Sequence, residues 1–531
     1  MRKVVVGGRQ MTVAADEERG ARPELVLCLC VAAGTDTRLV TDAFSEALLA
    51  VNYKPLPLRL SQLMSQIPGL EFLADVREED TRIRRSMSAG NEIRRVIGHA
   101  DAMARIALSE IQSIRKTLNK DSDESVPAEG HCFIVSSLKR AEELETLRRL
   151  FGQRVLLASV YEPKVARIDN LCRSIARSRS SPNPEAFCSV AEELIATDQK
   201  EHSNRFGQRL EDVFQSADVF LAAGKSLRED VRRFVQLLFR APYITPTVDE
   251  SLMVQARSAA HRSADLSRQV GAVIATPKGE ILATGCNEVP RAGGGVLWDD
   301  VAGTELDYRD YKMGQDPAAG TRKDIVAEVL QALADDGWLV EARKNQEKDA
   351  RAQSALFLET KPLAKTAVAN LLEFGRIVHA EMAAICDAAA RGVTIRESTL
   401  YCTTFPCHLC ARLIIASGIT RVVYIEPYAK SRAKQLYKRA IRVDHDDEFD
   451  TDAVKFEAFV GVSPARFFDL FQIVDRKDKQ GYALPVDVHG EHGPKGVEAG
   501  SLAAELEASY VATINTADWS QLNINYSGEV I

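Results

Sequence analysis

Two short segments constrain this chain more than any other part of its sequence: His379-Ala380-Glu381 and Pro406-Cys407-His408-Leu409-Cys410. One imidazole and two thiolates give three ligands of the kind that Zn²⁺ prefers, one fewer than a closed tetrahedral site needs. Catalytic zinc sites keep the fourth position for water, and a carboxylate two residues after the histidine can move the protons of that water. The segments therefore predict a catalytic Zn²⁺ site, with His379, Cys407 and Cys410 as ligands and Glu381 as the proton carrier.

The length and composition of the chain bound its class. With 531 residues it is too long for one ordinary core, so we expect two domains and extensions. No apolar run is long enough to span a bilayer, and the first twenty residues reach glycines and charges too early for a signal peptide. Ten cysteines in a chain of this length are not a secreted disulfide framework. We therefore expect a cytoplasmic protein with no membrane partner.

Strands and helices alternate in the first half. After a leader (1–22), Glu24–Ala33 has the apolar pattern of a buried strand and is followed by the turn Gly34-Thr35-Asp36-Thr37. An amphipathic helix over 39–51 and a strand over 55–61 come next, and strand patterns recur at 131–138, 154–161 and 216–224. This alternation predicts a parallel sheet covered on both faces, and the glycine turn is where a phosphate-binding loop would lie.

In layout, residues 23–240 resemble the P-loop nucleotide-kinase fold. The loop departs from that family's pattern, because Asp36 and Thr37 stand where a second glycine and a lysine belong. A carboxylate there repels a triphosphate, which argues against a working kinase. Two other hypotheses stay open: a packing domain without a ligand, and a nucleotide-sensing regulatory module in which residues Gly34 to Thr37 form the loop.

The second half begins after a proline-containing linker, 241–250. A helix over 251–265 and a hairpin around the turn 276–279 precede a charged, helix-patterned insertion at 299–374. The two metal-ligand segments follow, each at the start of a helix, with the strand-like TLYCTTF between them and RVVYIEP after them. This order predicts a three-layer α/β/α sandwich over 251–478, and 479–531 forms a C-terminal extension that we cannot place.

The second half resembles the zinc-dependent cytidine and deoxycytidylate deaminase family. The resemblance rests on the two metal-ligand segments and on four others: SRQVGA (267–272), GCNEVP (285–290), ASGI (416–419) and YIEPY (424–428). It implies that Glu381 carries a proton from the water to N3 of cytosine and then protonates the leaving amine. With the kinase-like half ahead of it, the chain resembles two-domain bacterial deaminases that deplete cytosine deoxynucleotides in phage defence.

The same resemblance assigns residues to the substrate. Asn287 is expected to hydrogen-bond the sugar hydroxyl, and Arg268 to contact the phosphate or to support the loop beneath it. The family often has a cysteine ahead of this arginine, and here the stretch reads Ala-Asp-Leu. Thr404 and Phe405 are expected to line the base pocket, and Tyr428 and Lys430 to lie near the phosphate.

These features predict hydrolytic deamination of free cytosine deoxynucleotides, dCMP or dCTP, to the uracil form with release of ammonia. The alternative is a deaminase of tRNA or single-stranded DNA, which needs a basic surface bearing aromatic side chains. A net charge of −7 and an aromatic content of 6% argue against that alternative and against nucleic acid as a substrate. A homo-oligomer is expected from the family, and a regulatory nucleotide is a further candidate partner.

Overall fold

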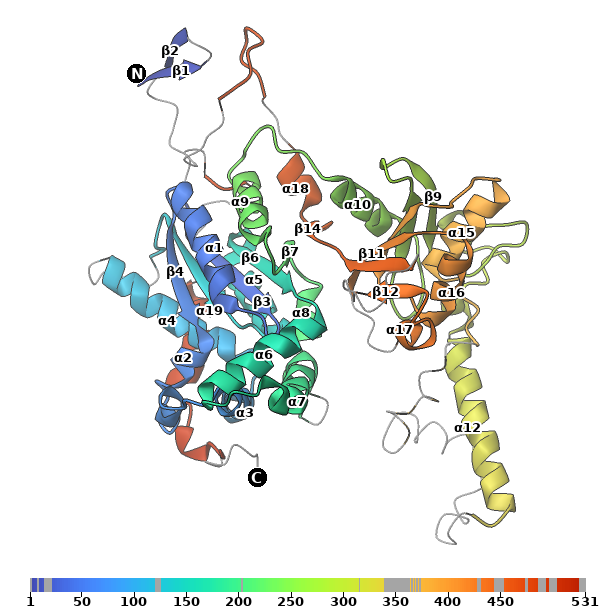
Figure 1. Cartoon of the computed structure of the whole chain (residues 1–531), viewed down its shortest axis with the longest axis horizontal. Helices are drawn as coiled ribbons and strands as arrows, with labels where there is room; N and C mark the ends of the chain where they lie inside the picture. Colours follow the sequence, from blue (N-terminus) through green and yellow to red (C-terminus); the bar gives the residue numbers. More distant parts are fainter. Residues whose placement is uncertain are drawn as a thin grey trace. The chain divides into compact units, whose positions relative to one another are not determined.

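The structure is a computed structural model, and it forms two compact units (Figure 1). The first unit consists of Met1–Glu250 with Val460–Ile531, and the second of Ser251–Phe459. The description covers residues 2–6, 9–13, 22–119, 126–201, 204–314, 316–338, 374–426, 431–443, 453–472, 476–485, 493–495 and 504–524, with residues 363, 366, 368 and 371. Residues 460–478 lie in the first unit, whereas the sequence pattern assigns them to the second domain.

The first unit is built on a six-stranded sheet in the order β14-β7-β6-β3-β5-β4. All neighbours are parallel except β14, which pairs antiparallel with β7. Its strands are β3 (Leu25–Val31), β4 (Lys54–Arg59), β5 (His131–Ser136), β6 (Val155–Tyr161), β7 (Val219–Ala222) and β14 (Gly461–Val462). Strands β1 (Arg2–Val6) and β2 (Arg9–Val13) form a separate hairpin.

Helices cover this sheet on both faces. They are α1 (Thr37–Ala50), α2 (Leu60–Met64), α3 (Glu79–Ile97), α4 (Ala102–Leu118), α5 (Ala141–Phe151), α6 (Lys164–Ser178), α7 (Cys188–Gln199), α8 (Leu210–Phe214) and α9 (Leu227–Leu238). Alternate residues of β3 share one core cluster with α1 and α9, and α4 and α5 pack together in another layer. Every residue of β3 is buried, as a central parallel strand requires. The predicted parallel sheet with two covered faces is confirmed.

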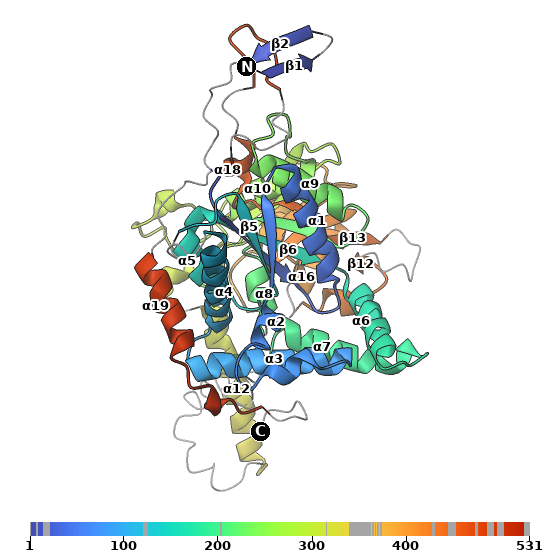
Figure 2. The ribbon, with the colours of Figure 1, turned by 90° about the vertical axis from the view of Figure 1, so that its left-hand side faces the viewer.

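The C-terminal helix α19 (Ala504–Asn515) also belongs to this unit and lies beside α4 (Figure 2). The contact is held by a buried charge network: the Arg115 guanidinium is 2.7 Å from carboxylate oxygens of both Glu24 and Glu507. Each of these three side chains is at most 1% exposed. A buried charge is tolerated only when it is paired in this way, so removing Arg115 would leave two uncompensated carboxylates.

The second unit has a six-stranded mixed sheet in the order β12-β13-β11-β10-β8-β9. Its elements are α10 (Val248–Ala260), β8 (Gly271–Ala275), β9 (Ile281–Cys286), α11 (Asp310–Met313), α12 (Pro317–Asp335), α15 (Ala380–Ala390), β10 (Thr399–Thr404), α16 (His408–Ala416), β11 (Arg421–Glu426), α17 (Ala433–Leu436), β12 (Ile441–Val443) and β13 (Val454–Ala458). The short helix α18 (Phe467–Phe471) follows in the chain and belongs to the first unit. Strand β8 runs antiparallel to both β9 and β10, and the pairs β10–β11–β13–β12 are parallel. The hairpin and the strands on either side of α16 are therefore confirmed.

Two glycines show that helices cover opposite faces of this sheet. In the β8–β9 register Gly271 pairs with Cys286, and Ala272 pairs with Gly285, so the two glycines point to opposite faces. A Cβ on Gly271 would lie 2.0 Å from the Ala256 carbonyl oxygen of α10, and one on Gly285 would lie 2.2 Å from the Ala380 carbonyl oxygen of α15. The helices approach too closely for any side chain there. The unit is a three-layer α/β/α sandwich, as predicted.

The predicted insertion at 299–374 is described only in part, and α12 is its long helix. Asp316 caps this helix by accepting a hydrogen bond from the Ala318 amide at 2.9 Å. Among the described residues, no helix has both the length and the apolar character that a membrane crossing requires.

Candidate metal centre

The topology of the second unit brings distant segments to one edge of its sheet. Strands β9, β10 and β11 end at this edge, and β8, which runs the opposite way, begins there. The edge therefore gathers the residues before β8, those after β9, and the Thr404–Cys407 stretch after β10. Val378 reaches the same edge by pairing with Glu288, and this pairing places His379 at the start of α15.

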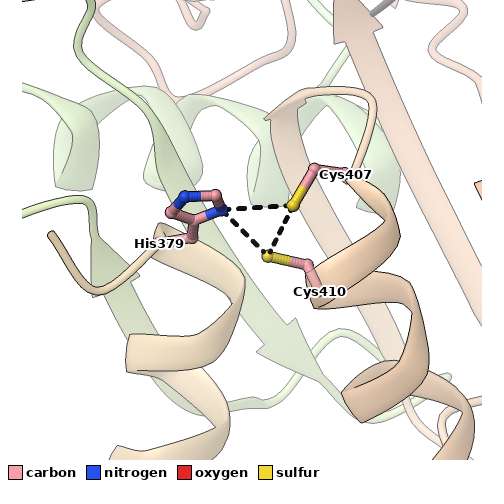
Figure 3. Close-up of side chains that lie close together, drawn as sticks. All are labelled: His379, Cys407 and Cys410. Carbon is pink, nitrogen blue, oxygen red and sulfur yellow. Dashed lines mark hydrogen bonds between the residues drawn. The ribbon is translucent and has the colours of Figure 1, made fainter. Parts of the chain in front are cut away.

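His379, Cys407 and Cys410 converge at that edge (Figure 3). His379 Nδ1 is 3.3 Å from each sulfur, and the two sulfurs are 3.6 Å apart. With Zn–S near 2.3 Å and Zn–N near 2.0–2.1 Å, a tetrahedral ion separates such ligand atoms by roughly 3.5–3.8 Å. The three atoms thus fit around one zinc ion, and no fourth ligand joins them among the residues that the structure describes. His408 is not part of the group.

Both helices that carry the ligands begin with a ligand residue. His379 is the N-cap of α15 and Cys407 the N-cap of α16, and neither side chain caps its own helix. Instead they face each other. The positive end of a helix dipole favours a thiolate, and Cys407 and Cys410 both lie in the first turn of α16.

The surroundings of Cys407 and Cys410 favour one thiolate between them even without a metal ion. A hydrogen bond from the Cys410 thiol, reinforced by His379, lowers the pKa of Cys407 to about 4. Burial raises the pKa of Cys410 well above its ordinary value. The pKa of His379 is raised, chiefly by its hydrogen bond with Cys407. A divalent cation would relieve the cost of holding a second thiolate here.

Glu381 lies beside the ligands, on the first turn of α15, and is 3% exposed. Burial raises the pKa of its carboxyl, and the charge of Cys407 adds to that shift. Burial and the Cys407 charge outweigh His379 and a hydrogen bond from Cys410, which both favour the charged form of Glu381. This environment suits a group that takes up and returns protons.

Asn287, predicted to bind the sugar, holds the loop that precedes β8. Its Oδ1 accepts a hydrogen bond from the Val270 amide at 2.6 Å, and its Nδ2 donates to Asp265 Oδ2 at 3.0 Å and to the Arg268 carbonyl at 2.8 Å. Both amide hydrogens are therefore used within the protein. One lone pair of Oδ1 remains, which can accept a hydrogen bond from a hydroxyl group.

Asp265 was not singled out from the sequence. Its Oδ1 accepts from the Ser267 amide at 2.6 Å while its Oδ2 binds Asn287, so one carboxylate fixes both the turn and the asparagine. The sequence did contain a signal for this turn, because an aspartate that caps the amide two residues later is typical of an Asx turn. Glu288 was also missed. It is buried and accepts hydrogen bonds from the Ala264 and Val289 amides, both at 2.8 Å.

Arg268 lies at the same edge and is half exposed. Its Nη1 is 3.4 Å from Glu426 Oε2, and solvent reaches both side chains, which weakens the attraction between their charges. Burial raises the pKa of the Glu426 carboxyl, and Arg268 opposes that shift. The guanidinium is thus near the centre and accessible to solvent.

Thr404 is the last residue of β10, and Phe405 follows it before the ligand helix α16. The Phe405 ring packs against Tyr424 and Phe456, with centroid distances of 4.9 and 5.4 Å, so it is anchored in the core below the edge. Tyr428 and Lys430 lie outside the described residues. The predicted loop from Gly34 to Thr37, with Thr35 and Asp36, lies in the first unit at the start of α1, so it belongs to a separate site.

Part of the chain is similar to known proteins. Residues 246–426 match the family described as "Cytidine and deoxycytidylate deaminase zinc-binding region". Most of the matched residues lie in the second unit. The predicted zinc cofactor is confirmed by this match together with the three converging ligand atoms.

Individual relatives cover less of the chain. The deoxycytidylate deaminase of Enterobacteria phage T4 is 46% identical over 55 residues, which are 10% of this chain and 28% of the phage protein. The probable deoxycytidylate deaminase of Drosophila melanogaster is 35% identical over 95 residues, 17% of this chain and 46% of the fly protein. In both, the matched stretch is less than half of the relative's length. The dCMP deaminase of cyanophage S-TIM5, solved with dCMP and dUMP, is 18% identical and covers 41% of this chain and 100% of its own, with a TM-score of 0.22.

Proposed function

We propose that the chain hydrolyses free cytosine deoxynucleotides, dCMP or dCTP, to the uracil form and releases ammonia. The observation that carries the proposal is the set of three ligand atoms 3.3–3.6 Å apart with Glu381 buried beside them. The matched deoxycytidylate deaminases support the same reaction and a mononucleotide substrate.

His379, Cys407 and Cys410 would hold the Zn²⁺ ion, which when bound would act as a Lewis acid and bring the pKa of water near neutrality. Glu381 performs the proton transfers. Its carboxylate takes a proton from the attacking water and delivers it to N3 of cytosine. It then takes the remaining proton from the hydroxyl formed on C4 and gives it to the departing amine, which leaves as ammonia while the C4 carbonyl forms. One water is consumed and one ammonia is released, so the exchange of C–N for C–O at C4 balances without another reactant.

The edge residues position the nucleotide around that chemistry. Asn287 offers its remaining lone pair to a sugar hydroxyl, and Arg268 turns from Glu426 to the phosphate. Thr404, Tyr428 and Lys430 complete the base and phosphate sides of the pocket, and Phe405 supports the base side from below. A phosphate would compensate Arg268 better than the loosely held Glu426 does, because a phosphate carries more charge and accepts bidentate hydrogen bonds.

The wider role follows from the same activity. A cytoplasmic enzyme that removes cytosine deoxynucleotides would deplete the pool that a replicating phage needs, and we propose this role in phage defence for a homo-oligomer of the chain. The strand order of the first unit, with β5 and β4 on one side of β3 and β6 and β7 on the other, supports the kinase-like layout predicted for 23–240.

The test is a comparison of substrates. Purified zinc-loaded protein is incubated separately with dCMP, dCTP, CTP and a cytosine-containing oligonucleotide, and the products are separated by chromatography. Glu381→Gln protein serves as the blank. We expect uracil products from dCMP or dCTP. Deamination of the oligonucleotide alone would show instead that the chain is a nucleic-acid deaminase, and no deamination of any substrate would refute the proposal.

A further inference from the structure

The first unit contains a cavity of about 1680 Å³ at the carboxyl ends of its parallel strands. Residues that follow β3, β4, β5 and β7 line it, and α2, α3 and α6 form its other walls. In sheets of this kind ligands bind outside the carboxyl ends, at the point where the strand order reverses. Strand β3 is at that point, since β5 and β4 lie on one side of it and β6 and β7 on the other. The cavity is larger than the roughly 300–1,000 Å³ of an ordinary ligand pocket.

Carboxylates of the protein itself occupy the loop at the start of α1. The Ala33 amide donates a hydrogen bond to Asp198 Oδ2 at 2.8 Å. The amides of Arg38 and Leu39 donate to Asp36 Oδ1 at 2.9 and 3.4 Å. The amides of Arg38 and Leu39 are among those that an anion would use at a helix N-terminus, and the Ala33 amide belongs to the loop before it. The loop is therefore an unsuitable place for a phosphate group.

The positive charge of the cavity lies elsewhere on its wall. Eight basic and four acidic residues line it: Arg38, Arg59, Arg82, Arg94, Lys139, Arg173, Arg177 and Lys225, against Asp36, Glu79, Glu162 and Asp198. Four of the basic side chains are already paired: Arg82 with Glu79, Arg94 with Glu143, Lys139 with Asp198, and Arg173 with Asp169.

The other four basic side chains are Arg38, Arg59, Arg177 and Lys225. Within the part of the chain that the structure describes, these four make no side-chain hydrogen bond or ion pair. They come from α1, the end of β4, α6 and the segment after β7, so they approach the cavity from separate elements. Unpaired cations on several walls of one cavity are the arrangement that a polyanionic ligand would neutralise.

A strained residue marks the same wall. Ser137, directly after β5, has φ of 79° although it is not glycine, and it lines the cavity. A conformation of this kind costs on the order of 1–3 kcal/mol and is found mainly at ligand sites. Arg59 lies beside it, because Arg59 pairs with Ser136 in the β4–β5 register. The strained residue and Arg59 therefore come from neighbouring positions of paired strands and line the same cavity.

The cavity also has an apolar side. Met64, Ile83, Met87 and Leu171, from α2, α3 and α6, line it together with the basic residues. A ligand that fits both sides has an anionic group and a flat or apolar one. We propose that this cavity binds a nucleotide, with the phosphates on the unpaired basic side chains and the base against the apolar side, and with no phosphate on the loop at residues 34–37. This proposal is independent of the deaminase activity proposed for the second unit.

The test measures binding by titration calorimetry on the full-length chain. The probes are ATP, GTP, UTP and CTP, each compared with its nucleoside and with inorganic phosphate. We expect at least one triphosphate to bind, and to bind about tenfold or more tightly than its nucleoside or phosphate alone. Arg59→Gln and Arg177→Gln should each weaken that binding by about tenfold or more, since each removes a hydrogen bond between charged groups.

Two further variants locate the phosphates. Arg232→Gln is the matched control, because Arg232 is an exposed helical arginine outside the cavity, and it should leave affinity unchanged. Thr37→Ala, in the loop, should also leave affinity within about twofold. Zinc content and circular dichroism report folding of every variant.

The proposal is overturned by any of three results. No triphosphate binds; or binding is as tight in Arg59→Gln and Arg177→Gln as in the unaltered chain; or Thr37→Ala abolishes binding while the arginine variants do not. Deamination of dCMP is assayed on the same samples, so a failure of the second unit's proposed activity is seen separately from a failure of nucleotide binding in the first.

Discussion

In both units a helix begins shortly after a buried strand: α1 after β3 in the first, and α16 after β10 in the second. In the second unit the residues at helix starts, His379 and Cys407, do not cap their own helices and instead face a common point. In the first unit Asp36 turns back and caps its own helix. The helix starts of the two units thus have different roles. In the second unit their side chains form a cation site, and in the first unit the Asp36 side chain accepts the hydrogen bonds of its own helix's amides.

A site built from side chains can be recognised in a sequence, whereas a site built from backbone amides cannot. Ligands supplied by side chains carry their chemistry in residue type and spacing. An anion site at a helix start is made of amides, which every residue has, so its availability depends on which side chains fold over it. Asp198, far from the loop in sequence, is one of those side chains here.

The largest effect is expected when one of the three zinc ligands is removed. Cys410→Ala should reduce zinc content from one ion per chain to near zero and deamination to the level of a protein-free blank, because two ligands cannot hold the ion in its geometry. Zinc is measured by elemental analysis and deamination by chromatography. Cys386→Ala, which removes an exposed thiol from α15, is the control and should retain both. Full zinc content in Cys410→Ala would mean that the ligand set is wrong.

A smaller effect is expected at the loop that Asn287 holds. Asp265→Ala removes the acceptor for Asn287 Nδ2 and for the Ser267 amide, and it should raise KM for dCMP about tenfold with little change in kcat. A positioning role predicts this split between KM and kcat. Lys278→Ala, in the exposed hairpin turn, should alter neither constant. An equal fall in kcat and kcat/KM would instead place Asp265 in the chemical step.

The smallest effect is expected when the Asp36 cap of α1 is removed in the first unit. Asp36→Ala removes the cap of α1 and should destabilise its first turn by about 1 kcal/mol, which corresponds to about fivefold faster hydrogen exchange of the Arg38 and Leu39 amides. Asp36→Asn keeps a capping oxygen and should exchange like the unaltered chain. If both variants exchange alike, the carboxylate does not cap the helix.

Much of the fold was predictable because its signals are local. The apolar run 25–31 and the alternation around the turn 276–279 each specify an element without reference to the rest of the chain. The three-layer order of the second unit then follows from the sequence of its elements. Likewise, the ligands and Glu381 are fixed by spacing within two short segments.

The rest could not be predicted because its signals are long-range. Strand β14 has two residues and joins the first sheet through pairing with β7, far away in sequence. Helix α19 belongs with α4 because Glu507 meets Arg115, a contact that no local pattern announces. For the same reason the sequence suggested Asn287 as a ligand residue but could not show that Asp265 and Arg268 already engage both of its amide hydrogens.

The central claim, that Glu381 carries protons at a zinc centre it does not ligate, is tested most directly by Glu381→Gln. This change keeps the shape of the side chain and removes its ability to take up a proton. We predict one zinc ion per chain, as in the unaltered protein, with dCMP deamination slower by about 10²–10⁴-fold. Full turnover with zinc bound would contradict the account.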